Sequence, residues 1–179
     1  HYGALSAGSY DAEADADAEI AGDSRSYDYF GHKVFANPDG WDIDGDGYDD
    51  FAVFEYYGNN DTGAVHVFNG GSTQWSGDYS ASSTEQFVVV GDTSYDYFGR
   101  AGVVDDLNGD GSADLALGAG GYDGGASSGG VAYGWYGPIS ASGTVTASTD
   151  NDFAITGDTA SQGIGGYTMA AGDNDGDGV

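Results

Sequence analysis

The chain has no cysteine, only two prolines, and three lysines or arginines among its 179 residues. Without cysteine there is no disulfide framework, so any cross-linking of loops has to come from another source, such as bound metal. Two prolines exclude a proline-rich linker. The few basic residues stand against 30 acidic ones, and the formal net charge of −27 argues against nucleic acids and anionic membranes as partners.

Glycine, aspartate and aromatic residues are plentiful instead. With 39% hydrophobic and 14% aromatic residues the chain can build a core, which sets it apart from disordered acidic sequences. The acidic residues are mostly Asp, which favours turns and ligand loops over helices. Such a charge suits a salty or calcium-rich exterior, where dissolved ions screen the self-repulsion.

A short acidic motif occurs three times. The first copy is residues 42–50 (DIDGDGYDD), the second is 106–114 (DLNGDGSAD), and the third is 173–179 (DNDGDGV), which holds seven of the nine positions. Oxygen-bearing side chains at every second position, with glycines that permit a tight turn, suit a hard cation such as Ca²⁺. The motif therefore predicts calcium loops.

The predicted ligands are the side chains at positions 1, 3, 5 and 9 and the backbone carbonyl at position 7. They are Asp42, Asp44, Asp46, Asp50 and the carbonyl of Tyr48 in the first loop, Asp106, Asn108, Asp110, Asp114 and the carbonyl of Ser112 in the second, and Asp173, Asp175, Asp177 and the carbonyl of Val179 in the third. Carboxylates gathered this closely repel one another, and a divalent cation offsets that cost.

Two alternatives compete with this interpretation. The loop openings also fit an EF-hand, but that motif needs Glu at position 12, where the chain has Val53 and Leu117 within apolar runs. A solvated acidic turn is the other alternative, since Asp and Gly are common in turns. Three copies at spacings of 64 and 67 residues favour metal binding over that alternative.

Other signals recur with the same period. A Gly-Asp pair precedes each loop at residues 22–23, 91–92 and 157–158, and the sequence YDYFG occupies 27–31 and 95–99. In the third copy Gly163-Ile164-Gly165 carries Ile164 where Phe is expected. A period of this length fits one four-stranded sheet better than a helical repeat.

Each full period contains four short runs rich in Val, Phe and Tyr and bounded by turn residues, and no window has convincing helical periodicity. The expected strands are 30–36, 50–56, 63–68 and 85–90 in the first period, and 98–104, 114–118, 130–136 and 152–156 in the second. Two low-complexity stretches, 12–18 and 140–149, are interpreted as connections within a blade.

These residues resemble a known family. Phe-Gly, then a D-x-D-x-D-G-x-x-D loop, then Gly118-Ala119-Gly120 look like FG-GAP repeats, found in the β-propeller head of integrin α-subunits and in many bacterial surface proteins. The second repeat matches best, whereas the first has residues 55–58 (EYYG) in place of GAP. The resemblance implies seven blades in a ring, with Ca²⁺ between the first two strands of a blade.

The expected fold is therefore an all-β partial propeller of four-stranded antiparallel blades. The predicted units are the end of a preceding blade (1–22), a blade with the first loop (23–91), a blade with the second loop (92–157), and the start of a further blade (158–179). A closed propeller needs at least four blades, so we expect either a longer protein or further copies to complete the ring.

The sequence predicts no catalytic residues. There is no Ser-His-Asp grouping, G-x-S-x-G elbow or cysteine nucleophile, and His1, His32 and His66 are interpreted as surface or packing residues. The aromatic residues at 27, 29, 95, 97, 135 and 136 are expected to pack between blades, with a sugar- or protein-binding surface as the alternative.

The leading functional hypothesis is an extracellular, calcium-binding module for adhesion or protein interaction, in which calcium is structural. The expected partners are a protein or glycan at a cell surface, together with further copies or the remainder of the propeller, and no direct membrane insertion is expected. Two alternatives stay open: a structural subunit of a surface layer or filament, and a carbohydrate-binding or accessory domain of a secreted enzyme.

Overall fold

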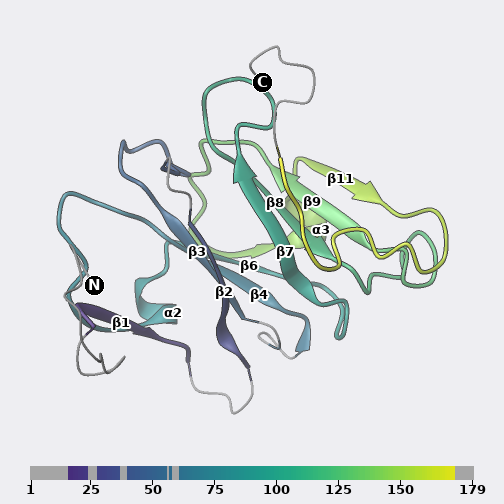
Figure 1. Ribbon diagram of the computed structural model, residues 1–179, viewed down its shortest axis with the longest axis horizontal. Helices are drawn as coiled ribbons and strands as arrows, with labels where there is room; N and C mark the ends of the chain where they lie inside the picture. Colours follow the sequence, from purple (N-terminus) through teal and green to yellow (C-terminus); the bar gives the residue numbers. More distant parts are fainter. Residues whose placement is uncertain (1–15, 24–27, 37–39, 56, 58–60, 172–179) are drawn as a thin grey trace, which may run out of the picture.

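The computed structural model describes residues 16–23, 28–36, 40–55, 57 and 61–171, which form short strands joined by turns (Figure 1). The strands are β1 (Ala18–Ala21), β2 (Phe30–Phe35), β3 (Phe51–Glu55), β4 (Ala64–Phe68), β5 (Gly77–Ser80), β6 (Phe87–Val90), β7 (Phe98–Asp105), β8 (Asp114–Ala119), β9 (Val131–Trp135), β10 (Gly143–Thr146) and β11 (Phe153–Thr156). Two single-turn helices, α2 (Ala81–Thr84) and α3 (Ala147–Asp150), follow β5 and β10.

Two four-stranded antiparallel units, here called blades, make up most of the molecule. The first blade has the order β6-β4-β3-β2, and the second has β11-β9-β8-β7. The two sheets follow one another in Figure 1, with β1 and α2 beyond the first. The predicted fold class, an all-β partial propeller of four-stranded antiparallel blades, is confirmed.

All eight predicted strands occur in the structure. Their observed ends differ from the predicted ones by two residues at most, because the apolar runs and the bounding Gly and Asp residues are local signals. The sequence analysis missed β5, β10 and both short helices, and it gave no bounds for β1, which lies in the unit 1–22 predicted as the end of a preceding blade. The stretch 140–149, interpreted as a connection within its own blade, instead contains β10 and α3 and reaches the neighbouring sheet.

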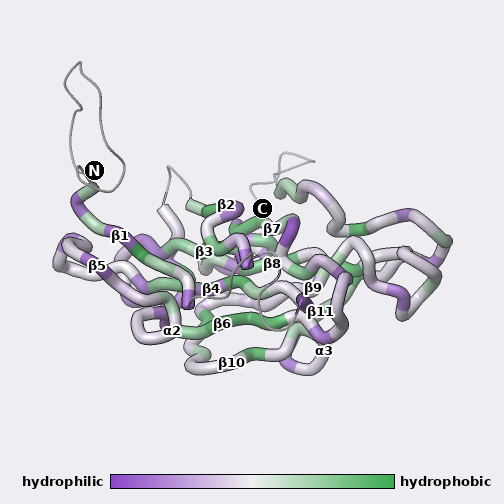
Figure 2. Tube along the Cα trace, turned by 90° about the horizontal axis from the view of Figure 1, so that it is seen from below, coloured by the Kyte–Doolittle hydropathy of each residue, from purple (hydrophilic) through white to green (hydrophobic). Residues whose placement is uncertain are grey.

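Each blade sends one segment across to the sheet before it. We call residues 77–84 (β5 and α2) and 143–150 (β10 and α3) the crossing segments; each lies between the third and fourth strands of its own blade. The first pairs in parallel with β1, and the second pairs in parallel with β6. Figure 2 shows β10 alongside β6, and β5 alongside β1. The crossing segments therefore add backbone hydrogen bonds between successive units.

The apolar core is shared by the two blades. Strands β4, β8 and β9 are buried along their whole length, as expected for the central strands of a stack of sheets. One cluster of buried side chains joins Phe54 and Val65 of the first blade to Phe98, Leu117 and Val131 of the second. The blades therefore pack face to face as one body, and the apolar burial stabilises both at once.

The Phe-Gly motif lies at this interface between the blades. The Phe98 amide donates to the Thr62 carbonyl (3.3 Å), and the Ile164 amide donates to the Gly129 carbonyl (3.0 Å) at the matching place one repeat later. Ile164 also forms an isolated bridge with Gly130. The expectation that Ile164 takes the position of Phe thus agrees with its backbone hydrogen bond.

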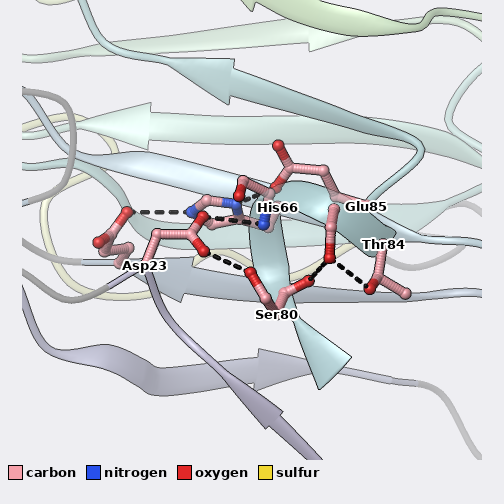
Figure 3. Close-up of polar contacts among 8 residues, drawn as sticks. Asp23, His66, Ser80, Thr84 and Glu85 are labelled. Carbon is pink, nitrogen blue, oxygen red and sulfur yellow. Dashed lines mark hydrogen bonds and ion pairs between the residues drawn. The ribbon is translucent and has the colours of Figure 1, made fainter. Parts of the chain in front are cut away.

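His66 forms a polar cluster near the core on β4. Its side chain is only 8% exposed; Nε2 lies 3.0 Å from a Glu55 carboxylate oxygen, and Nδ1 contacts the Glu85 carboxylate (Figure 3). Burial by itself favours the neutral ring, but the hydrogen bonds and negative charges of Glu85 and Glu55 outweigh burial and raise the pKa of His66 to about 9. The packing role expected for His66 therefore takes the form of a buried ion-paired imidazolium.

This cluster predicts a loss of stability in mild alkali. Because the pKa of His66 rises from 6.5 to about 9 on folding, its contribution is fully present below pH 6.5 and disappears as the pH rises through 9. We expect the free energy of unfolding to fall by up to about 3 kcal/mol across that window. Denaturant titrations at constant ionic strength and saturating calcium measure it. A His66→Gln variant should show a flatter profile, and an equally steep profile in that variant would refute the assignment.

Candidate metal centre

Both complete acidic loops join the first two strands of a blade. Residues 42–50 link β2 to β3, and residues 106–114 link β7 to β8. Gly45 and Gly47 have positive φ angles of 82° and 90°, which let the chain curl within a few residues. The Asp and Asn side chains at positions 1, 3 and 5 accept hydrogen bonds from amides two to five positions ahead, a local preference of these residues that holds the turn.

The carboxylate at position 1 organises the first loop. Asp42 Oδ1 accepts from the amides of Gly45 (2.7 Å) and Asp46 (2.9 Å), and Asp42 Oδ2 accepts from Gly47 (2.8 Å). The Asp46 amide also donates to Asp44 Oδ1 (3.0 Å), so this one amide is shared by two carboxylates. The loop backbone therefore wraps around the carboxylates, and their oxygens lie on its inner side.

The carboxylate at position 9 ties this loop to the sheet. Asp50 is 4% exposed; its Oδ2 accepts from the Ile43 amide (2.7 Å) and its Oδ1 accepts from the Gly70 amide (2.7 Å). Asn69, beside Gly70, donates its side-chain amide to Asp44. The loop start, the beginning of β3 and the turn after β4 thus meet at one buried carboxylate.

The second loop repeats this network. Asp106 accepts from Gly109, Asp110 and Gly111 (2.7–3.1 Å), as Asp42 does at the matching amides. Asp114 is fully buried and accepts from the amides of Leu107 (2.8 Å) and Gly137 (2.7 Å). The difference lies at position 3, where Asn108 supplies a neutral oxygen in place of the Asp44 carboxylate.

Three carboxylates of the first loop converge on one point. Oxygen atoms of Asp42, Asp44 and Asp50 all lie within 4.8 Å of one another. Burial raises the pKa of Asp44 and of Asp50, and neighbouring carboxylates add to the rise. Hard oxygen donors that face one another at this range fit a cation such as Ca²⁺, and its charge would favour the ionised forms.

The remaining predicted ligands differ in their setting. Asp46 and Asp110, at position 5, lie on the exposed side of their loops and accept from the amides of Tyr48 (2.9 Å) and Ser112 (2.8 Å), the residues whose carbonyls are predicted ligands. The third loop, with Asp173, Asp175, Asp177 and Val179, lies outside the described residues. Sequence reasoning missed Asn69, Gly70 and Gly137, which come from turns about 20 residues further along the chain and have no fixed position in the motif.

The first loop also contacts the second blade. Ile43, at position 2, is fully buried in the shared core, and its carbonyl accepts from the amide of Ile139 (2.7 Å), which follows β9. The loop conformation is therefore coupled to the packing between blades, because a shift of Ile43 would disturb both contacts.

Comparison with known proteins gives one family. The sequence model described as FG-GAP repeat matches residues 40–68 and 98–134, which include both complete acidic loops and strands β3, β4, β7 and β8. No curated protein matches the chain. FG-GAP repeats commonly bind Ca²⁺ and are typical of extracellular or surface proteins. Among the described residues, no helix has the length and apolar character needed to span a bilayer.

Proposed function

The chain carries FG-GAP repeats, and on this premise we propose that it is a non-catalytic, calcium-stabilised propeller module that acts outside the cell in adhesion or protein interaction. The repeats point to a β-propeller type of module that is often part of extracellular adhesion proteins. The strong negative charge agrees with such a setting, since an exterior rich in salt and calcium screens it.

The observation that carries the proposal is the convergence of Asp42, Asp44 and Asp50. Bringing three carboxylates within 4.8 Å of one another raises the electrostatic energy of the folded loop, and a divalent cation removes that cost. Because Asp50 also holds the start of the loop and the turn after β4, a bound ion links the first three strands of the blade.

Calcium in this role is structural. An ion that binds the folded loop and not the unfolded chain stabilises the protein by about 2.7 kcal/mol when its free concentration is 100 times the dissociation constant. Because the Ile43 carbonyl accepts from the Ile139 amide, an ion that holds the first loop in place also holds this contact between the blades. A partner at a cell surface would then bind a surface of the module whose rigidity depends on bound calcium.

We expect calcium to raise the melting temperature of chelator-stripped protein and to bind with measurable heat. Isothermal titration calorimetry gives the number of ions per chain, and thermal melts at each end of the titration give the stabilisation. Asp46→Ala and Asp110→Ala should each shrink the calcium-dependent shift, because each removes one predicted ligand without disturbing a buried contact. Asp78→Asn, on exposed β5, is the charge-matched control. Absence of both heat and thermal shift would mean that the loops are ordinary acidic turns.

A structural subunit of a surface layer or filament is the second candidate. It is favoured by the sheet edge at β11, the outermost strand of the second blade in the described part of the chain. Exposed strand edges pair readily with other chains. Light scattering over a range of protein concentrations separates this candidate from an isolated module.

A further inference from the structure

The crossing segments dock on their neighbours in the same register. Gly77 faces Ala18 and Ser80 faces Ala21 in the first pair of strands, and Gly143 faces Phe87 and Thr146 faces Val90 in the second. In sequence the two segments share Gly-x-x-(Ser/Thr)-Ala-Ser, at residues 77–82 and 143–148. The central alanines, Ala81 and Ala147, are both fully buried.

A carboxylate after the docking strand holds each crossing segment. Asp23, two residues after β1, accepts from Ser80 Oγ (2.6 Å) and from the Ser82 amide (2.9 Å), and Figure 3 shows Asp23 facing Ser80. Asp92, two residues after β6, accepts from Ser148 Oγ (2.6 Å) and from the Ser148 amide (3.1 Å). The carboxylate thus caps the first turn of the helix that follows the crossing strand.

A third docking strand with the same parts ends the second blade. β11 is followed by Gly157 and Asp158, as β6 is followed by Gly91 and Asp92. The Gly157 amide donates to the Gly130 carbonyl (2.9 Å), just as the Gly91 amide donates to the Gly63 carbonyl (3.0 Å). The strand and the glycine that follows it are therefore built alike in both blades, and in the described structure the Asp158 carboxylate accepts from Thr159 Oγ1 (3.0 Å).

The difference lies in what covers the strand. Within the described residues β11 is an edge strand, whereas β6 is paired on both sides. Ile155 occupies the position of Val89; its side chain is 57% exposed, while Val89 is fully buried opposite Val145 of the second crossing segment. An apolar side chain at the position that is buried in the neighbouring blade indicates a surface built to be covered.

We propose that the edge of β11 and the Asp158 carboxylate form a docking site for the crossing segment of another FG-GAP blade, a strand of the form Gly-x-x-(Ser/Thr)-Ala-Ser. The incoming strand pairs in parallel with β11, with its glycine opposite Phe153 and its Ser or Thr opposite Thr156. Asp158 accepts from the amide of the last serine, as in both occupied copies, and from a hydroxyl of the motif, which is the fourth residue in the first copy (Ser80) and the last serine in the second (Ser148). The two occupied copies in this chain supply the register, the motif and the polarity of the occupant.

The docking chemistry has two parts, one that gives affinity and one that gives specificity. Parallel pairing requires an extended segment with free backbone groups, which gives affinity without selecting side chains. The cap requires the amide of the last serine and a Ser or Thr hydroxyl of the motif directed at Asp158, and hydrogen bonds to an ionised acceptor are about twice as strong as neutral ones. The site contains no calcium ligand, so it goes beyond the proposed calcium role and can fail independently of it.

The probe is a fluorescently labelled peptide with residues 142–152 of this chain (SGTVTASTDND), titrated with the full chain in calcium and followed by anisotropy. We expect saturable binding that Asp158→Asn weakens by about 10-fold or more, as the loss of a charge-assisted cap predicts. A peptide with Ala in place of the serine at residue 148 should bind the chain more weakly by a similar factor. Unlabelled peptide 77–86 (GDYSASSTEQ), which carries the same motif, should compete.

Asp78→Asn is the matched protein control, because it removes the same charge from another exposed strand. Equal binding by Asp158→Asn and wild type, or no saturable signal at millimolar protein, would overturn the proposal. Calorimetry and thermal melts with calcium, run beside the peptide titration, separate the two proposals. If the peptide binds but calcium gives neither heat nor a thermal shift, the docking site holds and only the calcium role is refuted.

Discussion

Replacing Asp114 by Ala is expected to destabilise the protein by about 2–4 kcal/mol even without calcium. The Asp114 carboxylate is fully buried and accepts from the amides of Leu107 and Gly137, which link the loop start to the turn after β9. Its removal leaves both amides without this acceptor, and each such loss costs about 1–3 kcal/mol. Denaturant titration in chelator measures this part of the effect.

Comparison with Asp110→Ala separates the scaffold role from the calcium role. Asp110 lies at the exposed tip of the same loop and accepts from the Ser112 amide, which water can also reach. We expect Asp110→Ala to leave stability in chelator close to wild type and to lower only the increment that calcium adds. A variant of Asp114 as stable as wild type in chelator would contradict the buried anchor, and a full calcium increment in Asp110→Ala would contradict ligation by that residue.

Replacing Gly63 by Ala is expected to cost more than about 2 kcal/mol and to loosen the contact between the blades. Gly63 has a φ of 88°, where an alanine costs about 1–2 kcal/mol in backbone strain. Its added Cβ would lie 2.4 Å from the carbonyl oxygen of Phe98, so the strand of the second blade must shift. Because that contact is with backbone, no side-chain rotation relieves it. Thermal and denaturant unfolding measure the loss.

Gly71→Ala is the matched control for this substitution. Gly71 lies on the exposed turn after β4, and a Cβ there meets no atom within 4 Å. We expect a change within about 0.5 kcal/mol, as for most surface substitutions. If Gly63→Ala were equally mild, the close approach of the two blades at Phe98 would not hold in solution.

The candidate site was predictable to the extent that it is local. The spacing of Asp42, Asp44 and Asp50 sets both the loop and its oxygen ligands, because the turn geometry and the ligand order are written within nine residues. The turns after β4 and β9, which complete each loop through Gly70 and Gly137, were not predictable. They reach the site only after the sheet has formed, and a backbone amide carries no sequence signal.

The pairing of β5 and β10 with neighbouring sheets shows the same limit more clearly. Both are short, β5 is mostly exposed and β10 is exposed over its first half, and neither has the apolar alternation that identifies a strand, so nothing local distinguishes them from a loop. The signal that would have found them is the shared Gly-x-x-(Ser/Thr)-Ala-Ser motif, whose meaning depends on a partner strand in another unit. Asp23 and Asp92 likewise show their capping role only once that strand has docked.

The sequence by itself determined the repeat, the eight main strands, the acidic loops and the resemblance to FG-GAP repeats that the family model matches at residues 40–68 and 98–134, because each rests on residue types at short, regular spacing. Tertiary structure alone decided which elements meet across units. Among these are the crossing segments, the carboxylates that cap them and the His66 cluster, whose pKa depends on Glu55 and Glu85 from two other parts of the chain. Contacts between distant segments form only when core burial offsets the entropy of closing the chain between them, and no short stretch of sequence records that balance.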